Sequence, residues 1–151
     1  MSAKREIRIS QIMLPSQANN AGNVHGGEIM KMMDSAAGAV CHKYAKCNVV
    51  TARVDELQFI RPVLLGSMVI CIAKIVYVGN TTMEVIVTTE VEDLESDCDP
   101  EIALSGFFTM VALDKIGKPK KLKGFDPETE EEQILYDDAK QRREDYKKRL
   151  K

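Results

Sequence analysis

NNAGNVHGGEIMKMMDSAAGAVCHKYA, residues 19–45, is the stretch of sequence that decides the fold. Its first part is rich in asparagine and glycine, which predicts a loop. From Gly26 onward, apolar and small residues recur at helical spacing, which predicts one long helix over residues 26–45. The polar face of this helix is formed by Glu28, Lys31, Ser35 and His42. Because apolar side chains cover much of the remaining surface, we expect the helix to be packed on more than one side.

Predicted strands lie on both sides of this helix in the sequence. Residues 5–14 alternate apolar and polar side chains with one slip in phase, which predicts a strand with a bulge or bend near its end. Four later runs rich in Val, Ile, Thr and Phe predict strands at residues 48–60, 67–78, 81–93 and 102–113. Gly79-Asn80 predicts a tight hairpin. One buried helix followed by a run of strands predicts an α+β fold with a five-stranded, largely antiparallel sheet, one face of which meets solvent or another subunit.

The last segment, residues 125–151, differs in composition from the rest. It begins with acidic residues and ends with basic ones, an order that complements the helix dipole and predicts a C-terminal helix. It contains few apolar residues, so we expect its charge runs to form a solvated face. The chain is therefore divided into one domain at residues 1–124 and a charged helical extension at residues 125–151.

Composition limits the partners and the compartment. The chain has 151 residues and a formal net charge of -2, which argues against a nucleic-acid partner. It has no run of about eighteen apolar residues that would predict a transmembrane helix. Its first ten residues lack the apolar core of a secretory signal. The four cysteines show no CxxC pairing, which favours reduced thiols and gives no reason to expect a metal site. We expect a cytoplasmic protein that does not bind membranes.

Asp34 and the glycine pair that opens the helix suggest a chemistry. At about 100° per residue, Asp34 lies on the flank of the apolar surface, where a carboxylate is costly unless it is paired or functional. The unpaired N–H groups near Gly26 and Gly27 carry the positive end of the helix dipole. Donors of this kind contribute roughly 3–4 kcal/mol each when they face a developing oxyanion. With a carboxylate that activates water or attacks directly, they suit acyl transfer from a thiolate leaving group.

Each of these residues also has a purely structural interpretation. Asp34 could pair with a lysine or arginine of a neighbouring chain, and Gly26-Gly27 could be only a tight entry to the helix. Asparagines are common in turns, so a turn role is open for Asn19, Asn20 and Asn23. A thiol nucleophile at Cys41, with His42 as its base, is disfavoured because adjacent residues on a helix point about 100° apart.

The segments MLPSQANNAGNVHGGEIMKMMDSAAGAV (13–40) and VVTARVDELQFIRPVLLGS (49–67) resemble the acyl-CoA hydrolase family of hotdog thioesterases. The similarity is greatest to the brain-type cytosolic and bacterial YciA-type enzymes, and it runs from about residue 5 to about residue 120. The resemblance implies the hotdog fold, in which the sheet wraps around the long helix. It also implies a hexamer built as a trimer of dimers, and hydrolysis of fatty acyl-CoA to free fatty acid and CoA. Coenzyme A is then part of the substrate, and no other cofactor is expected.

The resemblance also implies roles for individual residues. Asp34 matches the general base or nucleophile, and Asn19 matches an asparagine that the opposing subunit contributes, with Asn20 one position away. The N–H groups near Gly26 and Gly27 would polarise the thioester carbonyl. Many YciA-type relatives carry arginine in the hairpin where this chain has Asn80. The residues expected to contact substrate or CoA are His25, Arg61, Asn80, Thr81, Thr82, Lys118 and Lys120.

Two other functions are compatible with a hotdog fold. The first is a hydratase or dehydratase acting on acyl chains, but such enzymes tend to pair a histidine with the helical acid. Here the DSAAG segment offers no histidine on the face of Asp34. The second is a non-catalytic acyl-CoA-binding regulator, although the sequence contains no DNA-binding module ahead of the predicted sheet.

Overall fold

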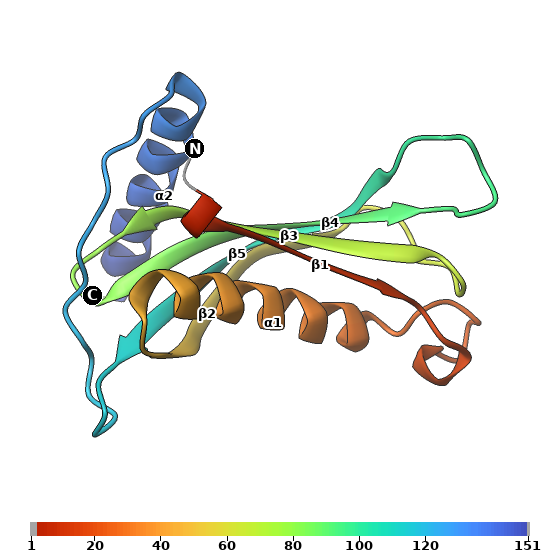
Figure 1. The fold of residues 1–151 in the computed structure, drawn as a ribbon, viewed down its shortest axis with the longest axis horizontal. Coiled ribbons are helices and arrows are strands. Elements are labelled where there is room, and N and C mark those ends of the chain that lie inside the picture. The colour runs from red at the N-terminus through yellow and green to blue at the C-terminus, as the bar shows by residue number, and fades with distance from the viewer. Residues whose placement is uncertain (1–2, 151) are drawn as a thin grey trace.

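One curved sheet and two helices make up the part of the chain that the computed structural model describes, residues 3–150. The strands are all antiparallel and run in the order β1-β3-β4-β5-β2 across the sheet. Their bounds are β1 Glu6–Ile12, β2 Asn48–Phe59, β3 Met68–Val78, β4 Thr82–Glu92 and β5 Glu101–Leu113. Helix α1 (Gly26–Ala45) lies along one face and α2 (Glu130–Arg149) lies on the other side at one end (Figure 1). The predicted α+β hotdog fold with a C-terminal helix is confirmed.

Helix α1 begins and ends where its sequence predicts. At its start the His25 ring accepts a hydrogen bond from the Gly27 N–H, which makes His25 the N-cap. At its end Lys46 takes the left-handed conformation, with φ 59°, and its N–H donates to the carbonyl of His42 at 2.8 Å. This arrangement satisfies a carbonyl that the helix would otherwise leave unpaired.

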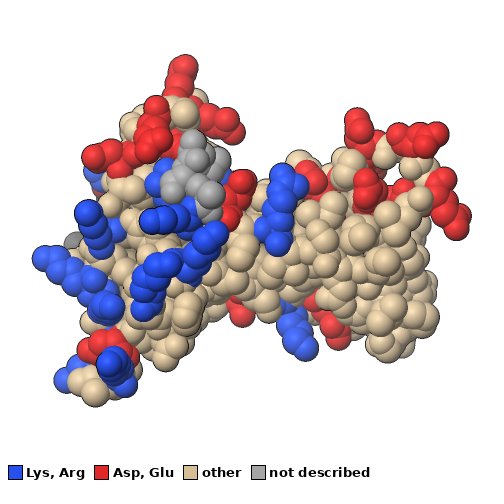
Figure 2. All heavy atoms as spheres, in the orientation of Figure 1, with Lys and Arg blue, Asp and Glu red and all other residues tan. Residues whose placement is uncertain are grey.

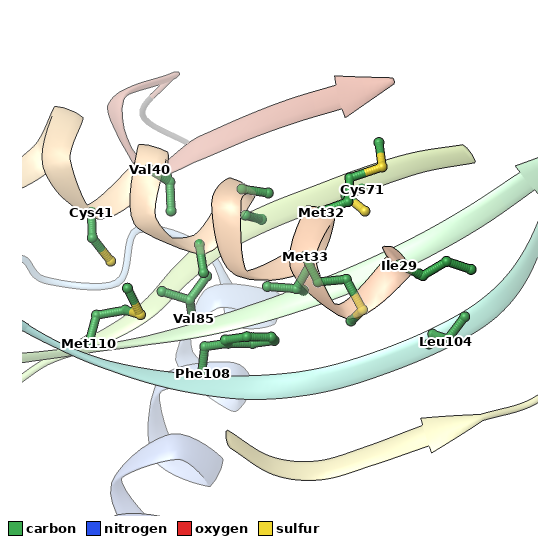
Figure 3. Close-up of a cluster of buried hydrophobic side chains, with 14 of the residues drawn as sticks. Ile29, Met32, Met33, Val40, Cys41, Cys71, Val85, Leu104, Phe108 and Met110 are labelled. Atoms are coloured by element: carbon green, nitrogen blue, oxygen red, sulfur yellow. The ribbon is translucent and has the colours of Figure 1, made fainter. Parts of the chain in front are cut away.

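The core lies between α1 and the concave face of the sheet. Figure 3 shows Ile29 and Met33 of α1 close to side chains of β4 and β5. The buried face of α1 consists of Ile29, Met32, Met33, Ala36, Ala37, Val40 and Cys41. Two adjacent alanines in the middle of this face let the helix approach the strands closely. Each large side chain that is fully buried here contributes about 1.5–3 kcal/mol relative to an exposed one.

The irregularities of the sheet lie in strands other than the predicted one. Strand β1 pairs with β3 without a register shift from Glu6 to Ile12, so the bulge expected in residues 5–14 is absent there. The change of phase instead marks the end of the strand, because a 3-10 turn follows at Pro15–Gln17. Strand β2 carries two register shifts, between Thr51 and Arg53 and between Asp55 and Gln58.

Helix α2 packs on the sheet through arginine–aromatic contacts. The Arg142 guanidinium lies 3.5 Å from the centroid of the Phe107 ring and 3.2 Å from the buried Glu84 carboxylate. Near the end of the helix, Arg53 lies 3.4 Å from the centroid of the Tyr146 ring. The side of α2 that meets the sheet thus carries polar and aromatic contacts together with the buried Ala139, while most of the other charged side chains of the helix are exposed.

Neither α1 nor α2, the two long helices within residues 3–150, is apolar enough along its length to cross a membrane.

Candidate active site

Asp34 lies midway along α1 on the side that faces β2. The Thr51 hydroxyl of β2 donates a hydrogen bond of 2.5 Å to Asp34 Oδ1, and its oxygen lies 3.5 Å from the Met110 sulfur. Within the described part of the chain, Asp34 Oδ2 has no hydrogen-bond partner, and both Asp34 and Thr51 are exposed. Thr51 therefore holds one carboxylate oxygen in place and leaves the other open to a ligand.

The sequence did not indicate Thr51 as a site residue. Threonine is common in strands and Thr51 lies in a run that is typical of one. Its role depends on how β2 lies beside α1, which is a tertiary feature. The available signal was the return of the chain from Ala45 into β2, which runs back along α1 and brings the start of the strand next to the middle of the helix.

The first turn of α1 leaves one backbone N–H open. The Gly27 N–H donates to His25 Nδ1 at 3.0 Å, and the Glu28 N–H donates to the His25 carbonyl at 3.0 Å. The Gly26 N–H has no acceptor among residues 3–150. Of the two expected oxyanion donors, Gly26 is the one available in the single chain.

A phenyl ring lies against the start of the helix. A Cβ atom added to Gly26 would lie 3.1 Å from Phe59 Cζ, so only glycine permits this contact without movement of the ring. The Phe59 side chain is 54% exposed. It forms one wall of a cavity of about 180 Å³ whose lining also includes Asn19, Gly26 and Arg61. The open N–H group therefore lies in a small pocket bounded by an aromatic ring.

Asn19 combines a turn role with a free donor group. Its Oδ1 accepts hydrogen bonds from the N–H groups of Ala21 at 2.9 Å and Asn23 at 3.1 Å. These bonds fix the side-chain amide, and no acceptor for its Nδ2 lies within residues 3–150. Asn19 is partly buried and lines the same cavity as Gly26, whereas Asn20 is exposed and does not. The geometry therefore favours Asn19 over Asn20 as a site residue.

The two halves of the site are separated within one chain. Asp34 follows Gly26 by eight positions along the helix, which is about 12 Å along the axis. Neither Asp34 nor Thr51 lines the cavity that holds Asn19 and Gly26. A single carbonyl group cannot reach both halves in one chain.

The residues expected to contact CoA lie at several places in the structure. Arg61 forms an ion pair with Glu101 and donates to the Ile102 carbonyl at 3.0 Å, so its charge is largely neutralised within the chain. The carbonyls of Asn80 and Thr81 accept hydrogen bonds from Leu122 and Ala112, which holds the hairpin beside the segment that contains Lys120.

The remaining members of this set differ in position. Thr82 closes the hairpin, because its carbonyl accepts from the Gly79 N–H at 2.8 Å. Lys120 lines a cavity at the C-terminal end of α1. Lys118 is exposed and does not line that cavity.

The cysteines do not contribute a nucleophile at α1. Cys41 is fully buried, and burial raises the pKa of its thiol far above the usual range. The adjacent His42 is exposed, so the two side chains point apart, as the helical spacing predicts. All four cysteines are free thiols. In the described chain, no group of three or more His, Cys, Asp or Glu side chains could hold a metal ion.

Known protein sequences resemble this chain over most of its length. The model of the thioesterase superfamily matches residues 21–98. The cytosolic acyl coenzyme A thioester hydrolase of Mus musculus is 34% identical over 129 residues, which cover 85% of this chain and 34% of the mouse protein. The chain thus spans about a third of the length of that relative. Protein VdlD of Helicobacter pylori is 33% identical over 141 residues, 93% of this chain and 80% of the relative.

Solved structures agree with the sequence matches. A hexameric acyl-CoA thioesterase in the apo state superposes with a TM-score of 0.90 at 32% identity, covering 96% of this chain and 92% of the other. The acyl-CoA hydrolase of Staphylococcus aureus, solved with butyryl coenzyme A and coenzyme A, gives a TM-score of 0.87 at 32% identity and covers 96% and 88%. Structures of that hydrolase with one aspartate, threonine or asparagine replaced by alanine also match. Together with the fold, these matches show that the chain belongs to the thioesterase superfamily.

Proposed function

We propose that this protein is an acyl-CoA thioester hydrolase, which releases a free fatty acid and CoA. The observation that carries the proposal is the carboxylate of Asp34, held at one oxygen by Thr51 and open at the other. The names of the relatives in mouse and Staphylococcus aureus support this substrate class. The mouse relative is described as cytosolic, which supports a cytoplasmic location.

The spacing of three residues supports the same site. The asparagine, aspartate and threonine replaced in the Staphylococcus aureus hydrolase follow one another at intervals of fifteen and seventeen positions. Asn19, Asp34 and Thr51 follow one another at the same intervals. This agreement favours Asn19 over its neighbour and adds Thr51 to the proposed site.

In the proposed reaction the thioester carbonyl binds near Gly26. The Gly26 N–H and the Asn19 side-chain amide donate to the carbonyl oxygen, which makes the carbonyl carbon more electrophilic. Asp34 then removes a proton from an attacking water, or attacks the carbon itself and is released by water in a second step. The tetrahedral intermediate collapses and expels the CoA thiolate. Thiols have a pKa of about 8.5, so the thiolate leaves readily.

The site is proposed to be shared between two chains, because its halves lie too far apart in one. Asn19 and Gly26 of one subunit would face Asp34 and Thr51 of the other. Strand β2 is an edge strand of the sheet, so its outer backbone groups are unpaired in the single chain. Apolar side chains are exposed near this edge, with Val50 at 47% and Met30 of α1 at 40%. A second copy paired at β2 would cover them.

The protein should therefore not be a monomer. We expect light scattering at micromolar concentration to give the mass of a hexamer built from three such dimers, by analogy with the hexameric thioesterase it superposes on. Pairing at β2 accounts for the dimer, because an exposed apolar edge must be covered. A monomeric mass under these conditions would contradict the shared site.

The proposed activity is tested by thiol release from a panel of acyl-CoA substrates of different chain length. We expect thiol to appear with at least one member of the panel, in proportion to the protein added. A hydratase or dehydratase would change the enoyl absorbance of an unsaturated substrate without releasing thiol. A regulatory protein would bind acyl-CoA and release nothing. Either result would exclude the hydrolase.

A further inference from the structure

We propose that α2 holds the first bulge of β2 in the shape that aims the Thr51 hydroxyl at Asp34, with Tyr146 as the positioning residue. This inference rests on the proposed acyl-CoA hydrolase activity, in which Asp34 acts as base or nucleophile. Helix α2 and Asp34 lie on opposite sides of the sheet (Figure 1). Tyr146 therefore acts on the reaction through β2 and does not touch the substrate.

The first bulge of β2 turns two nearby side chains to opposite faces of the sheet. Thr51 pairs with Met110 of β5 and Arg53 pairs with the adjacent Thr109, so Ala52 is the extra residue of the bulge. In a regular strand, residues two positions apart point to the same face. Here Thr51 faces α1 and Arg53 faces α2. The direction of the Thr51 side chain therefore depends on the bulge keeping its place.

Two contacts hold the Arg53 side chain beneath α2. Its guanidinium carbon lies 3.4 Å from the centroid of the Tyr146 ring, and its Nη2 lies 2.7 Å from Asp55 Oδ2. Its buried Nε has no hydrogen-bond acceptor within residues 3–150. A contact between a cation and an aromatic ring is stronger where water is excluded. The Tyr146 ring is therefore a main support of Arg53.

The contact with Tyr146 belongs to a row of side chains that crosses three strands. Thr109 of β5 is the register partner of both Arg53 of β2 and Glu84 of β4. Arg142 donates to the buried Glu84 carboxylate at 3.2 Å. Because Arg142 and Tyr146 are four positions apart, they lie on the same face of α2 and cover this row together. The end of α2 is thus fixed directly over the bulge.

Surface charge does not fix α2 on the sheet. Figure 2 shows acidic side chains over the start of α2 and Lys and Arg side chains toward its end, in agreement with its acidic first turn and basic last turn. Exposed charges of this kind are screened by salt and contribute little to packing. The position of the helix over β2 therefore depends on its inner face, where Arg142 and Tyr146 are half-buried.

The bulge has a weaker support on the side of α1. There the Thr51 hydroxyl donates to Asp34 and lies 3.5 Å from the Met110 sulfur. Both Thr51 and Asp34 are exposed, so water competes for their hydrogen bond. A loss of the contacts on the α2 side would therefore let the bulge shift and let the hydroxyl move away from the carboxylate.

The test is a double-mutant cycle with Thr51→Val. Tyr146→Leu removes the ring and keeps an apolar side chain. We expect it to lower kcat about threefold with KM unchanged, because the substrate still binds while Asp34 is no longer held. In the Thr51→Val background the same substitution should leave kcat unchanged, since no hydroxyl remains to be positioned.

Two further variants separate positioning from a general loosening of α2. Tyr136→Leu removes a ring of the same helix that packs on Tyr77, with centroids 4.9 Å apart, and lies about 15 Å from Tyr146 along the axis. It should leave kcat unchanged. Tyr146→Phe keeps the ring and should keep kcat. A loss of equal size in both Thr51 backgrounds, a similar loss for Tyr136→Leu, or no loss for Tyr146→Leu would overturn the role of Tyr146.

Hydrogen exchange tests the same contact without hydrolysis. Tyr146→Leu should speed the exchange of backbone amides in residues 48–55, while the amides of β1 and β3 exchange as in the unmodified protein. Tyr146→Phe should show no change. Unchanged exchange in Tyr146→Leu would overturn the role of Tyr146 whether or not the protein releases thiol. Faster exchange in a protein that releases no thiol would refute the proposed function and retain the contact of α2 with the bulge.

Discussion

Asp34→Asn is expected to lower kcat/KM for acyl-CoA at least a hundredfold, about 2.7 kcal/mol of transition-state stabilisation. The amide keeps the size of the side chain but cannot accept a proton from water or attack the carbonyl. The assembly should be unaffected, because asparagine keeps the size of the side chain and can still accept the hydrogen bond that Thr51 donates, the one bond Asp34 makes with its side chain among residues 3–150. Thiol release and light scattering on the same preparation measure both properties.

Thr51→Val provides the matched comparison. It removes the hydroxyl that holds Asp34 Oδ1 and keeps the shape of the side chain. Because the carboxylate remains, we expect a loss in kcat/KM that is smaller than the loss for Asp34→Asn. If Asp34→Asn retains more than about a tenth of the activity, a loss below about 1.4 kcal/mol, Asp34 is neither base nor nucleophile.

Mixing two inactive variants is expected to restore activity. Asn19→Ala and Asp34→Ala should each be nearly inactive alone. If each site takes Asn19 from one subunit and Asp34 from the other, a mixed dimer has one site with both defects and one with neither. Random exchange makes about half of the dimers mixed, so activity should recover to about a quarter of the unmodified level.

Subunit exchange must be shown independently, for example by mass spectrometry of differently tagged chains. A site built within one chain would leave every site in the mixture defective, and the activity would stay at the level of the parents. Confirmed exchange without recovered activity would therefore exclude the shared site and the pairing of Asn19 with Asp34.

The sequence predicted the parts of the molecule that local patterns determine. Helix α1 occupies residues 26–45 as expected, because the helical spacing of its apolar residues and the glycine pair at its start indicate the same helix. The loop before it and the hairpin at Gly79-Asn80 follow from turn chemistry in the same way. Thr51 could not be found by such means, because its contact with Asp34 depends on the path of β2 beside the helix.

Two further features depended on tertiary context. The sequence places Gly27 and Gly26 equally at the helix start, but the ring of His25 occupies the N–H group of Gly27. A hydrophobicity pattern cannot reveal the contact of Arg142 with Phe107 and Glu84. In the sequence, an arginine that stacks on an aromatic ring cannot be told from an arginine that is exposed to solvent.

The two bulges of β2 bear on which strands this edge accepts. A regular strand from an unrelated protein would lose hydrogen-bond register at each bulge, near Thr51 and again near Glu56, where φ is 51°. If the proposed dimer places its two-fold axis between the two bulges, a second copy of this chain brings the same irregularities in mirrored order, so that each bulge faces the other copy's bulge. Pairing of β2 would then favour a second copy of this chain over the regular edge strand of another protein.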